Sequence, residues 1–277
     1  NEKAPAQPVG KPLNEAAVWQ RALIMAAGAF MNFLLGFVVM VVLIAAQSEP
    51  ITSRVIYAID DGALCGQTGL EAGDKVLAVN GRRCFVANDM LYELMRTEDY
   101  SAHFTVLRGG EKVELPCVRF DTWQDDSGET HMSLGFTVYG IRKTPANVVK
   151  EAWNSVLYYG RIIFTSLMDL LRGRESINDL SGPVGIVTAI GQAASYGWQD
   201  LLQLLVLITV NLGIFNLLPF PALDGGKVVF LLIEGVTGHA VPEKIQSGLT
   251  LAAFALLFGL MLFATYNDIL RLITGAV

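Results

Sequence analysis

Long apolar runs without charged residues are the main feature of the hydrophobic pattern along this chain. No charged residue occurs between positions 22 and 46, and this run is longer than the roughly 20 residues that a helix needs to cross a bilayer. Two more apolar segments occupy residues 201–233 and about 247–267, and the first of these two is interrupted. The pattern predicts three membrane-spanning helices, of which the second is broken.

The interruption lies where Pro219 and Pro221 are followed by Asp224, Gly225 and Gly226. Proline removes a backbone donor and favours extended geometry in the residue before it, whereas glycine permits close approach of other backbone. A charged aspartate near the centre of a spanning helix costs about 2.5–3.5 kcal/mol and usually marks a site. We therefore expect a loop that places the Asp224 carboxylate at the start of a second half-helix.

Two roles for Asp224 follow from its sequence position. The carboxylate could act as an oxygen ligand for a metal ion, or it could form an ion pair with Lys227 three residues later on the same helix. The spacing alone leaves both roles open.

Residues 51–138 differ from the rest of the chain, because short apolar runs alternate there with turn sequences. Gly109-Gly110 predicts a β-hairpin, and Asp89–Arg96 has helical spacing with Asn88 as a possible N-cap. The segment is predicted to be a small α+β domain with its own core. Its predicted strands are Ser53–Ile59, Val76–Val79, Phe104–Leu107 and Lys112–Cys117.

Residues 146–172 are predicted to form an amphipathic helix that lies in a membrane interface or packs against another domain. Beyond it, Gly182-Pro183 is expected to break the chain before the next apolar run. The apolar stripe of the amphipathic helix comprises Val149, Trp153, Val156, Leu157, Ile163, Phe164 and Leu167.

Residues 1–21 are polar and contain prolines, which predicts a flexible segment. Basic residues in short flanks favour the cytoplasmic side, so this segment and the region around Lys244 are predicted to be cytoplasmic. The 51–200 region would then lie outside the cytoplasm, although Arg271 opposes this orientation. The basic residues before the first span are Lys3, Lys11 and Arg21.

The composition agrees with a membrane protein that carries a polar domain. Of the 277 residues, 52% are hydrophobic and 17% are charged, with a mean hydropathy of +0.44. A net charge of −6 without a basic stripe argues against a nucleic-acid partner. The three cysteines, Cys65, Cys84 and Cys117, imply no disulfide framework, and we expect them to be small buried residues.

The run Ile59–Gly81 resembles PDZ domains of the bacterial protease type. The recurring pairs of that family stand here as Gly69-Leu70, Gly73-Asp74 and Asn80-Gly81. We expect Gly73-Asp74 to turn the chain into a strand, Asn80-Gly81 to turn it out, and Leu70 to pack beneath. This resemblance implies that an extended peptide is bound as an added strand at an open sheet edge, which we place near Arg54–Ile59. A rigid domain that binds no peptide is the alternative.

The broken span carries a longer pattern, N-x-x-P-x-P-x-L-D-G-G, formed by residues 216–226. It resembles the signature of site-2 proteases, which are intramembrane zinc metalloproteases, and is similar to the bacterial branch that cleaves membrane-bound anti-sigma factors. Ala27-Gly28 and Asn32 match a second family motif, A-G-P-x-x-N, with Ala29 in place of its proline, and Ser181-Gly182-Pro183 matches a third. The resemblance covers about residues 20–272 and implies an α-helical multi-pass membrane core with an inserted small α+β PDZ-like domain.

The resemblance also implies a site. Zinc would be held by Asp224 and by two histidines of an H-E-x-x-H helix, whose glutamate would activate the attacking water. Asn211, Asn216, Pro219 and Pro221 would hold the substrate backbone in an extended form, although interhelical hydrogen bonding is an alternative for both asparagines. The implied substrate is a single-span membrane protein of the anti-sigma-factor type, cleaved in a bacterial inner membrane, with a separate peptide or protein ligand at the extracytoplasmic PDZ-like domain.

The chain departs from the family because it contains no H-E-x-x-H. Its three histidines, His103, His131 and His239, do not have the required spacing. In the family the histidine helix is the first span, so we expect a fragment that begins in the loop before the second span. Both the catalytic glutamate and two zinc ligands would then lie upstream. The alternative is a catalytically inactive, membrane-anchored PDZ binding module.

Overall fold

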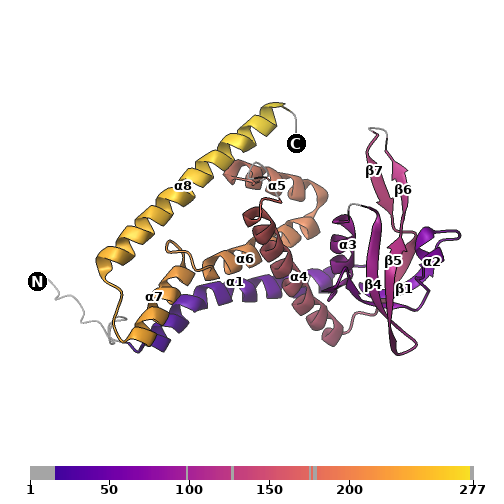
Figure 1. Ribbon diagram of the computed structural model, residues 1–277, viewed down its shortest axis with the longest axis horizontal. Helices are drawn as coiled ribbons and strands as arrows, with labels where there is room; N and C mark the ends of the chain where they lie inside the picture. The colour runs from indigo at the N-terminus through magenta and orange to yellow at the C-terminus, as the bar shows by residue number, and fades with distance from the viewer. Residues whose placement is uncertain (1–15, 98, 126–127, 175, 177–179, 275–277) are drawn as a thin grey trace, which may run out of the picture. The chain divides into compact units, whose positions relative to one another are not determined.

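The computed structural model describes residues 16–97, 99–125, 128–174, 176 and 180–274 (Figure 1). Most of the predicted polar segment 1–21 lies outside the described residues. The chain forms two compact units, which are described separately: Asn1–Val39 with Ile162–Val277, and Met40–Arg161.

The first unit is helical. Among the described residues, three helices are long and apolar enough to cross a membrane: α1 (Val18–Ala46, which continues into the second unit), α6 (Trp198–Leu217) and α8 (Glu243–Thr274). This number agrees with the three predicted spans. The broken second span appears as α6 followed by a separate helix, α7 (Asp224–Thr237).

Helices α1 and α6 pack closely through glycines on both sides. A Cβ added to Gly36 of α1 would lie 3.1 Å from a Val210 methyl group, and one added to Gly213 of α6 would lie 3.0 Å from the Phe33 ring. Phe33 of α1 meets Gly213 of α6, whereas the later residue Gly36 meets the earlier residue Val210, so the two helices are antiparallel. Small residues that let helix backbones approach are typical of packing in a membrane.

A helix that the sequence did not predict, α5 (Pro183–Tyr196), follows the expected break at Gly182-Pro183. Pro183 occupies its first turn, and the backbone N–H of Gly185 donates to the Asp268 carboxylate of α8 at 2.7 Å. A Cβ on Gly182 would lie 2.8 Å from the Thr265 nitrogen, so glycine is required there for α8 to approach. Asp268 thus caps the start of a neighbouring helix.

The second unit contains an antiparallel sheet with the strand order β5-β4-β2-β1-β8, and β3 also pairs with β2. Strands β6 and β7 form a separate two-stranded sheet. The sheet contacts the short helix α2 and the longer α3, and this arrangement agrees with the predicted small α+β domain. The elements are β1 (Ile51–Ile59), α2 (Leu64–Gln67), β2 (Lys75–Val79), β3 (Arg82–Arg83), α3 (Ala87–Met95), β4 (Ser101–Arg108), β5 (Glu111–Arg119), β6 (Asp121–Gln124), β7 (Thr130–Ser133) and β8 (Phe136–Ile141).

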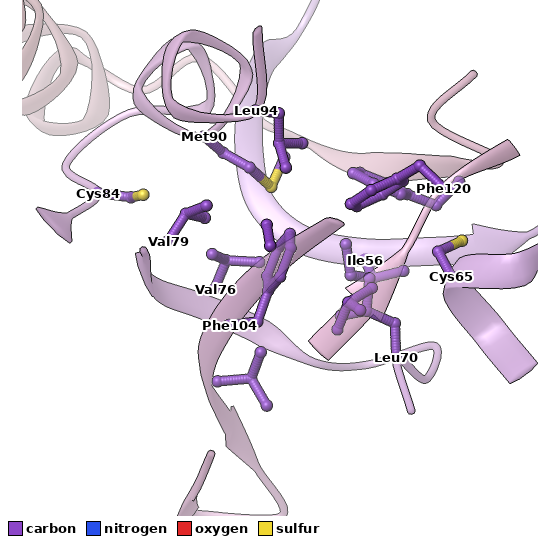
Figure 2. Close-up of a cluster of buried hydrophobic side chains, with 14 of the residues drawn as sticks. Ile56, Cys65, Leu70, Val76, Val79, Cys84, Met90, Leu94, Phe104 and Phe120 are labelled. Atoms are coloured by element: carbon purple, nitrogen blue, oxygen red, sulfur yellow. The ribbon is translucent and has the colours of Figure 1, made fainter. Parts of the chain in front are cut away.

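The core of this unit lies between the sheet and α3 (Figure 2). Phe104 of β4 and Ile56 of β1 are fully buried, and Met90 and Leu94 of α3 pack in the same cluster. Leu70 is buried beneath the turn that precedes β2, as the sequence predicted. These residues give the unit a hydrophobic core of its own.

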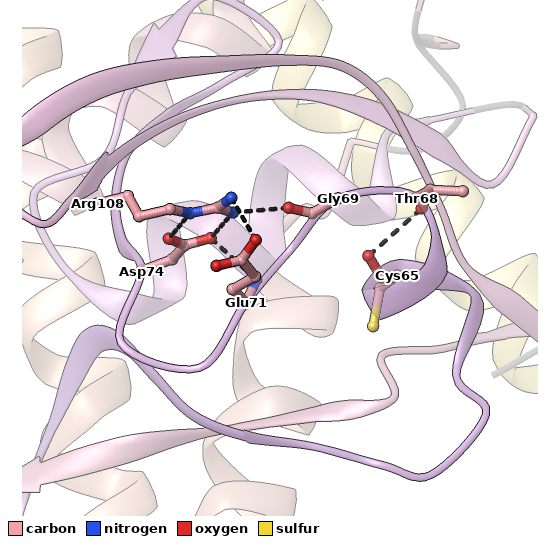
Figure 3. A network of polar contacts seen from close by, with 6 residues as sticks. All are labelled: Cys65, Thr68, Gly69, Glu71, Asp74 and Arg108. Atoms are coloured by element: carbon pink, nitrogen blue, oxygen red, sulfur yellow. Dashed lines mark hydrogen bonds and ion pairs between the residues drawn. The ribbon is translucent and has the colours of Figure 1, made fainter.

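The turns into and out of β2 also match the prediction. Gly73 (φ 95°), Asn80 (φ 50°) and Gly81 (φ 76°) occupy left-handed backbone conformations that suit these residue types. Asp74 is fully buried, and its two carboxylate oxygens accept hydrogen bonds from Arg108 at 2.7 Å each (Figure 3). The aspartate therefore joins the turn to β4.

Two local predictions for this unit were wrong. The sheet edge was expected at β1, but β1 pairs with β8 on one side and with β2 on the other, so the edges of the described sheet are β5 and β8. The predicted N-cap, Asn88, lies inside α3. The Asp89 carboxylate instead accepts hydrogen bonds from the backbone nitrogens of Phe85 and Val86 before the helix.

Helix α4 (Pro145–Leu171) corresponds to the predicted amphipathic helix, and Val156 is the residue of its predicted apolar stripe that is buried in this unit. Val149, Trp153 and Leu157 are exposed, because polar groups anchor the opposite side. Arg161 donates to Asp89 and to the Arg83 carbonyl, and burial raises the pKa of Glu151, whose charged form Arg54 stabilises. The residues that α4 buries here are Val148, Ala152, Val156 and Tyr159.

The cysteine prediction holds for two of three residues, since Cys65 and Cys84 are buried and Cys117 is exposed. Burial raises the pKa of Cys84 to about 11. Because the thiolate is the reactive form, we expect a maleimide at pH 7 to label Cys117 at least about 100-fold faster than Cys84. Mass spectrometry of the native and the denatured protein measures the labelling of each cysteine. Equal labelling rates of Cys117 and Cys84 in the native state would contradict the prediction.

Candidate metal and substrate site

The site is built on the loop between α6 and α7. Helix α6 ends at Leu217, and Leu218 (φ −61°, ψ 142°) and Leu223 (φ −108°, ψ 166°) have extended backbone. Within the loop, the Phe220 nitrogen donates to the Leu218 carbonyl at 2.7 Å and the Leu223 nitrogen to the Phe220 carbonyl at 2.9 Å. The prolines thus interrupt the helix as predicted, and the loop retains its own hydrogen bonds.

Two glycines allow the first turn of α7 to pack against this loop. A Cβ on Gly225 would lie 2.2 Å from the Leu218 carbonyl oxygen, and one on Gly226 would lie 2.3 Å from the Phe220 carbonyl oxygen. Both neighbours are backbone atoms, so a side chain could be accommodated only by moving the loop. The structural role predicted for Gly225 and Gly226 follows from these distances.

Asp224 is the first residue of α7, and its side chain is 39% exposed. Lys227 Nζ lies 3.4 Å from Asp224 Oδ1, and its own side chain is 55% exposed, so the pair is loose and solvated. A Cβ added to Gly28 of α1 would lie 3.7 Å from Asp224 Oδ2. The carboxylate therefore faces a position on α1 that has no side chain.

The three asparagines singled out in the sequence lie on two helices, α1 and α6. Asn32 is half-buried and stands one helical turn from Gly28 on the same side of α1. Asn211 is exposed and Asn216 half-buried, both on α6, and neither side chain hydrogen-bonds to another residue that the structure describes. Interhelical hydrogen bonding, the alternative role for both, is absent within the described part of the chain.

Thr250 of α8 is a residue of the site that the sequence did not indicate. Its hydroxyl donates to the Pro221 carbonyl at 3.2 Å and so fixes the loop to α8. Pro219 is exposed and Pro221 half-buried. A threonine in an apolar helix carries no local signal for such a contact, so only the structure could reveal it.

The histidines do not join Asp224 in the described residues. His103 and His131 belong to the second unit, and His239 follows the end of α7, where its ring contacts the Thr237 carbonyl. Asp224 thus suits one carboxylate ligand of a metal, and the other ligands of such a site would have to come from elsewhere. A separate group in the β6–β7 hairpin has metal-ligand spacing and consists of half-buried Asp125 and His131 and exposed Glu129, but exposed acidic groups are common without an ion.

Comparison with known proteins decides the family. Peptidase family M50 matches residues 2–260. The chain belongs to this family. The site-2 proteases that the sequence motifs resemble are members of it, so the resemblance is confirmed.

Curated relatives extend the comparison. The chain is 30% identical over 271 residues to the regulator of sigma-W protease RasP of Bacillus subtilis, an alignment that covers 98% of this chain and 64% of the relative. It is 34% identical to the zinc metalloprotease RasP of Geobacillus kaustophilus, over 90% of this chain and 59% of the relative. The putative zinc metalloprotease Atu1380 of Agrobacterium fabrum is 29% identical, over 94% of this chain and 72% of the relative. The chain therefore spans less than two thirds of both RasP proteins.

Proposed function

We propose that this chain is the larger part of an intramembrane zinc metalloprotease that cleaves single-span membrane proteins, such as anti-sigma factors. The observation that carries the proposal is the position of Asp224, which the proline loop and two glycines hold at the start of α7, facing Gly28. Membership of peptidase family M50 and similarity to proteins named zinc metalloproteases support zinc as the metal.

Asp224 would serve as the carboxylate ligand of this zinc, with two histidines and a glutamate general base supplied from outside the 277 residues. Zinc bound there would polarise water for attack on a peptide bond. The amide groups of Asn211 and Asn216, which lack partners in the described structure, would hydrogen-bond the substrate backbone. The extended loop around Pro219 and Pro221 would hold that backbone out of its helical form.

The second unit would act as a PDZ-like ligand-binding domain on the extracytoplasmic side of a bacterial inner membrane. Its antiparallel sheet, α3 and the confirmed turns around β2 support the PDZ-like assignment. A peptide added as a strand would pair with β5 or β8, the edges of the described sheet. The three apolar helices support contact with the lipid bilayer.

A cleavage assay in membranes tests the proposal. The protein is expressed from its own gene, with any residues that precede Asn1, beside a reporter whose single span carries tags on both sides. We expect cleavage within the span, its loss on chelation with 1,10-phenanthroline, and its recovery on adding zinc. Cleavage that a chelator leaves unchanged would contradict the metalloprotease assignment.

The second candidate is a catalytically inactive membrane-anchored binding module. The observation that favours it is that no histidine lies with Asp224 among the described residues. The gene discriminates between the two candidates. An apolar segment with H-E-x-x-H before Asn1 supports the protease, and its absence supports the binding module.

A further inference from the structure

Helix α7 lies antiparallel along the first half of α1, and small residues lie at both ends of the contact. At one end, Asp224 Oδ2 would lie 3.7 Å from a Cβ on Gly28, and at the other, Val18 Cγ1 would lie 3.6 Å from a Cβ on Gly235. The two points are separated by about 15 Å on α1 and about 16.5 Å on α7 at 1.5 Å per residue. The helices therefore run side by side over this length.

One ion pair joins the two helices between these points. Arg21 of α1 pairs with Glu234 of α7, and the side chains are only 17% and 20% exposed. Arg21 is the only charged residue in the sequence of α1. Glu234 is next to Gly235 and Arg21 is one turn from Val18, so the pair lies close to the Val18–Gly235 end of the contact.

The glycine contacts alone do not define the register. Gly28 and Gly235 present no side chain, so they permit close approach without a protrusion that resists sliding. A slip of one helical turn would move Asp224 by about 5.4 Å relative to Gly28. Among the contacts between α1 and α7, the pair of weakly exposed charges opposes such a slip, because separating them would leave each charge desolvated without its partner; it adds to the hold of the loop on the first turn of α7.

We propose that Arg21 and Glu234 are positioning residues that set the register of α7 on α1, and thereby the place of Asp224 beside Gly28. Neither residue touches the reacting atoms. The effect on catalysis rests on the proposed function, whereas the effect on register does not.

Disulfide trapping measures the register without reference to activity. Val18→Cys and Gly235→Cys are introduced together, and the protein is studied in membranes. Exposed Cys117 is replaced by serine so that it cannot compete for cross-linking, whereas Cys65 and Cys84 are buried and can stay. We expect rapid cross-linking in this parent and a rate at least about tenfold lower after Arg21→Gln or Glu234→Gln, because each leaves one charge without its partner. The exchanged pair, Arg21→Glu with Glu234→Arg, should restore the rate.

Glu243→Gln is the matched control, since Glu243 is an exposed acidic residue in the first turn of α8, and it should leave cross-linking unchanged. If the single variants cross-link as fast as the parent, or the exchanged pair fails to restore the rate, the proposal is wrong.

The second measurement is the kinetics of cleavage by proteins without the added cysteines. We expect each single variant to lower kcat with little change in KM, and the exchanged pair to restore kcat. If the parent protein shows no proteolytic activity but its cross-linking responds to the variants as expected, the proposed function is wrong and the register assignment is still supported. A loss of kcat with cross-linking unchanged would overturn the register assignment alone.

Discussion

Replacement of Asp224 by alanine should abolish cleavage of the membrane reporter. The carboxylate is the only candidate metal ligand in the described loop, and it faces Gly28 rather than a competing side chain. Loss of an outer partner of a metal site commonly costs about 10–100-fold, so loss of a direct ligand should exceed that range. The assay compares cleavage rates and zinc content of the purified proteins.

Lys227→Ala provides the control for this prediction. Lys227 is the charged neighbour of Asp224, but its ammonium group is well exposed and 3.4 Å away, so its removal should change the rate by less than about threefold. Asp224→Asn retains the shape of the side chain and should be as inactive as the alanine variant. Unchanged cleavage after Asp224→Ala would rule out the assigned ligand role.

Gly225→Ala should lower cleavage at least about 100-fold, since displacement of a catalytic group by 1 Å can have an effect of this size. The new methyl group would lie 2.2 Å from the Leu218 carbonyl oxygen and 2.6 Å from the Leu217 carbonyl carbon, so the loop or the start of α7 must shift. The measurements are the cleavage rate and the protease sensitivity of the loop in membranes.

Gly248→Ala is the matched substitution in α8, where an added Cβ meets no atom within 4 Å. Because alanine is also the better helix former, this variant should keep full activity and stability. Equal behaviour of the Gly225 and Gly248 variants would show that the close approach at Gly225 does not matter for the site.

The sequence could predict the parts of the structure that local rules determine. Uncharged runs of sufficient length identified the spanning helices, and the two prolines identified the break before Asp224. Gly73, Asn80 and Gly81 were identified as turn residues because few other residue types adopt left-handed backbone easily. Each of these inferences depends on a short stretch of chain.

The parts that depend on contacts between distant segments could not be predicted. Strand β8 lies about eighty residues after β1, and nothing near Arg54–Ile59 indicates that its edge is covered. The amphipathic pattern of α4 did not show which of its residues contact the second unit, because Arg161 and Glu151 find partners far away in sequence. Thr250 and Asp268 act on loops and helices that precede them, so their roles have no local signature.

The position of these last two residues in the chain has a consequence for assembly. Thr250 and Asp268 both belong to α8, yet their partners, Pro221 and the start of α5, are synthesised earlier. Until α8 enters the membrane, the loop before Asp224 lacks one of its hydrogen-bond donors, and the first turn of α5 lacks its acceptor. Completion of the loop is therefore tied to the synthesis of α8, so a nascent chain that stops before α8 would contain the whole signature without its finished loop.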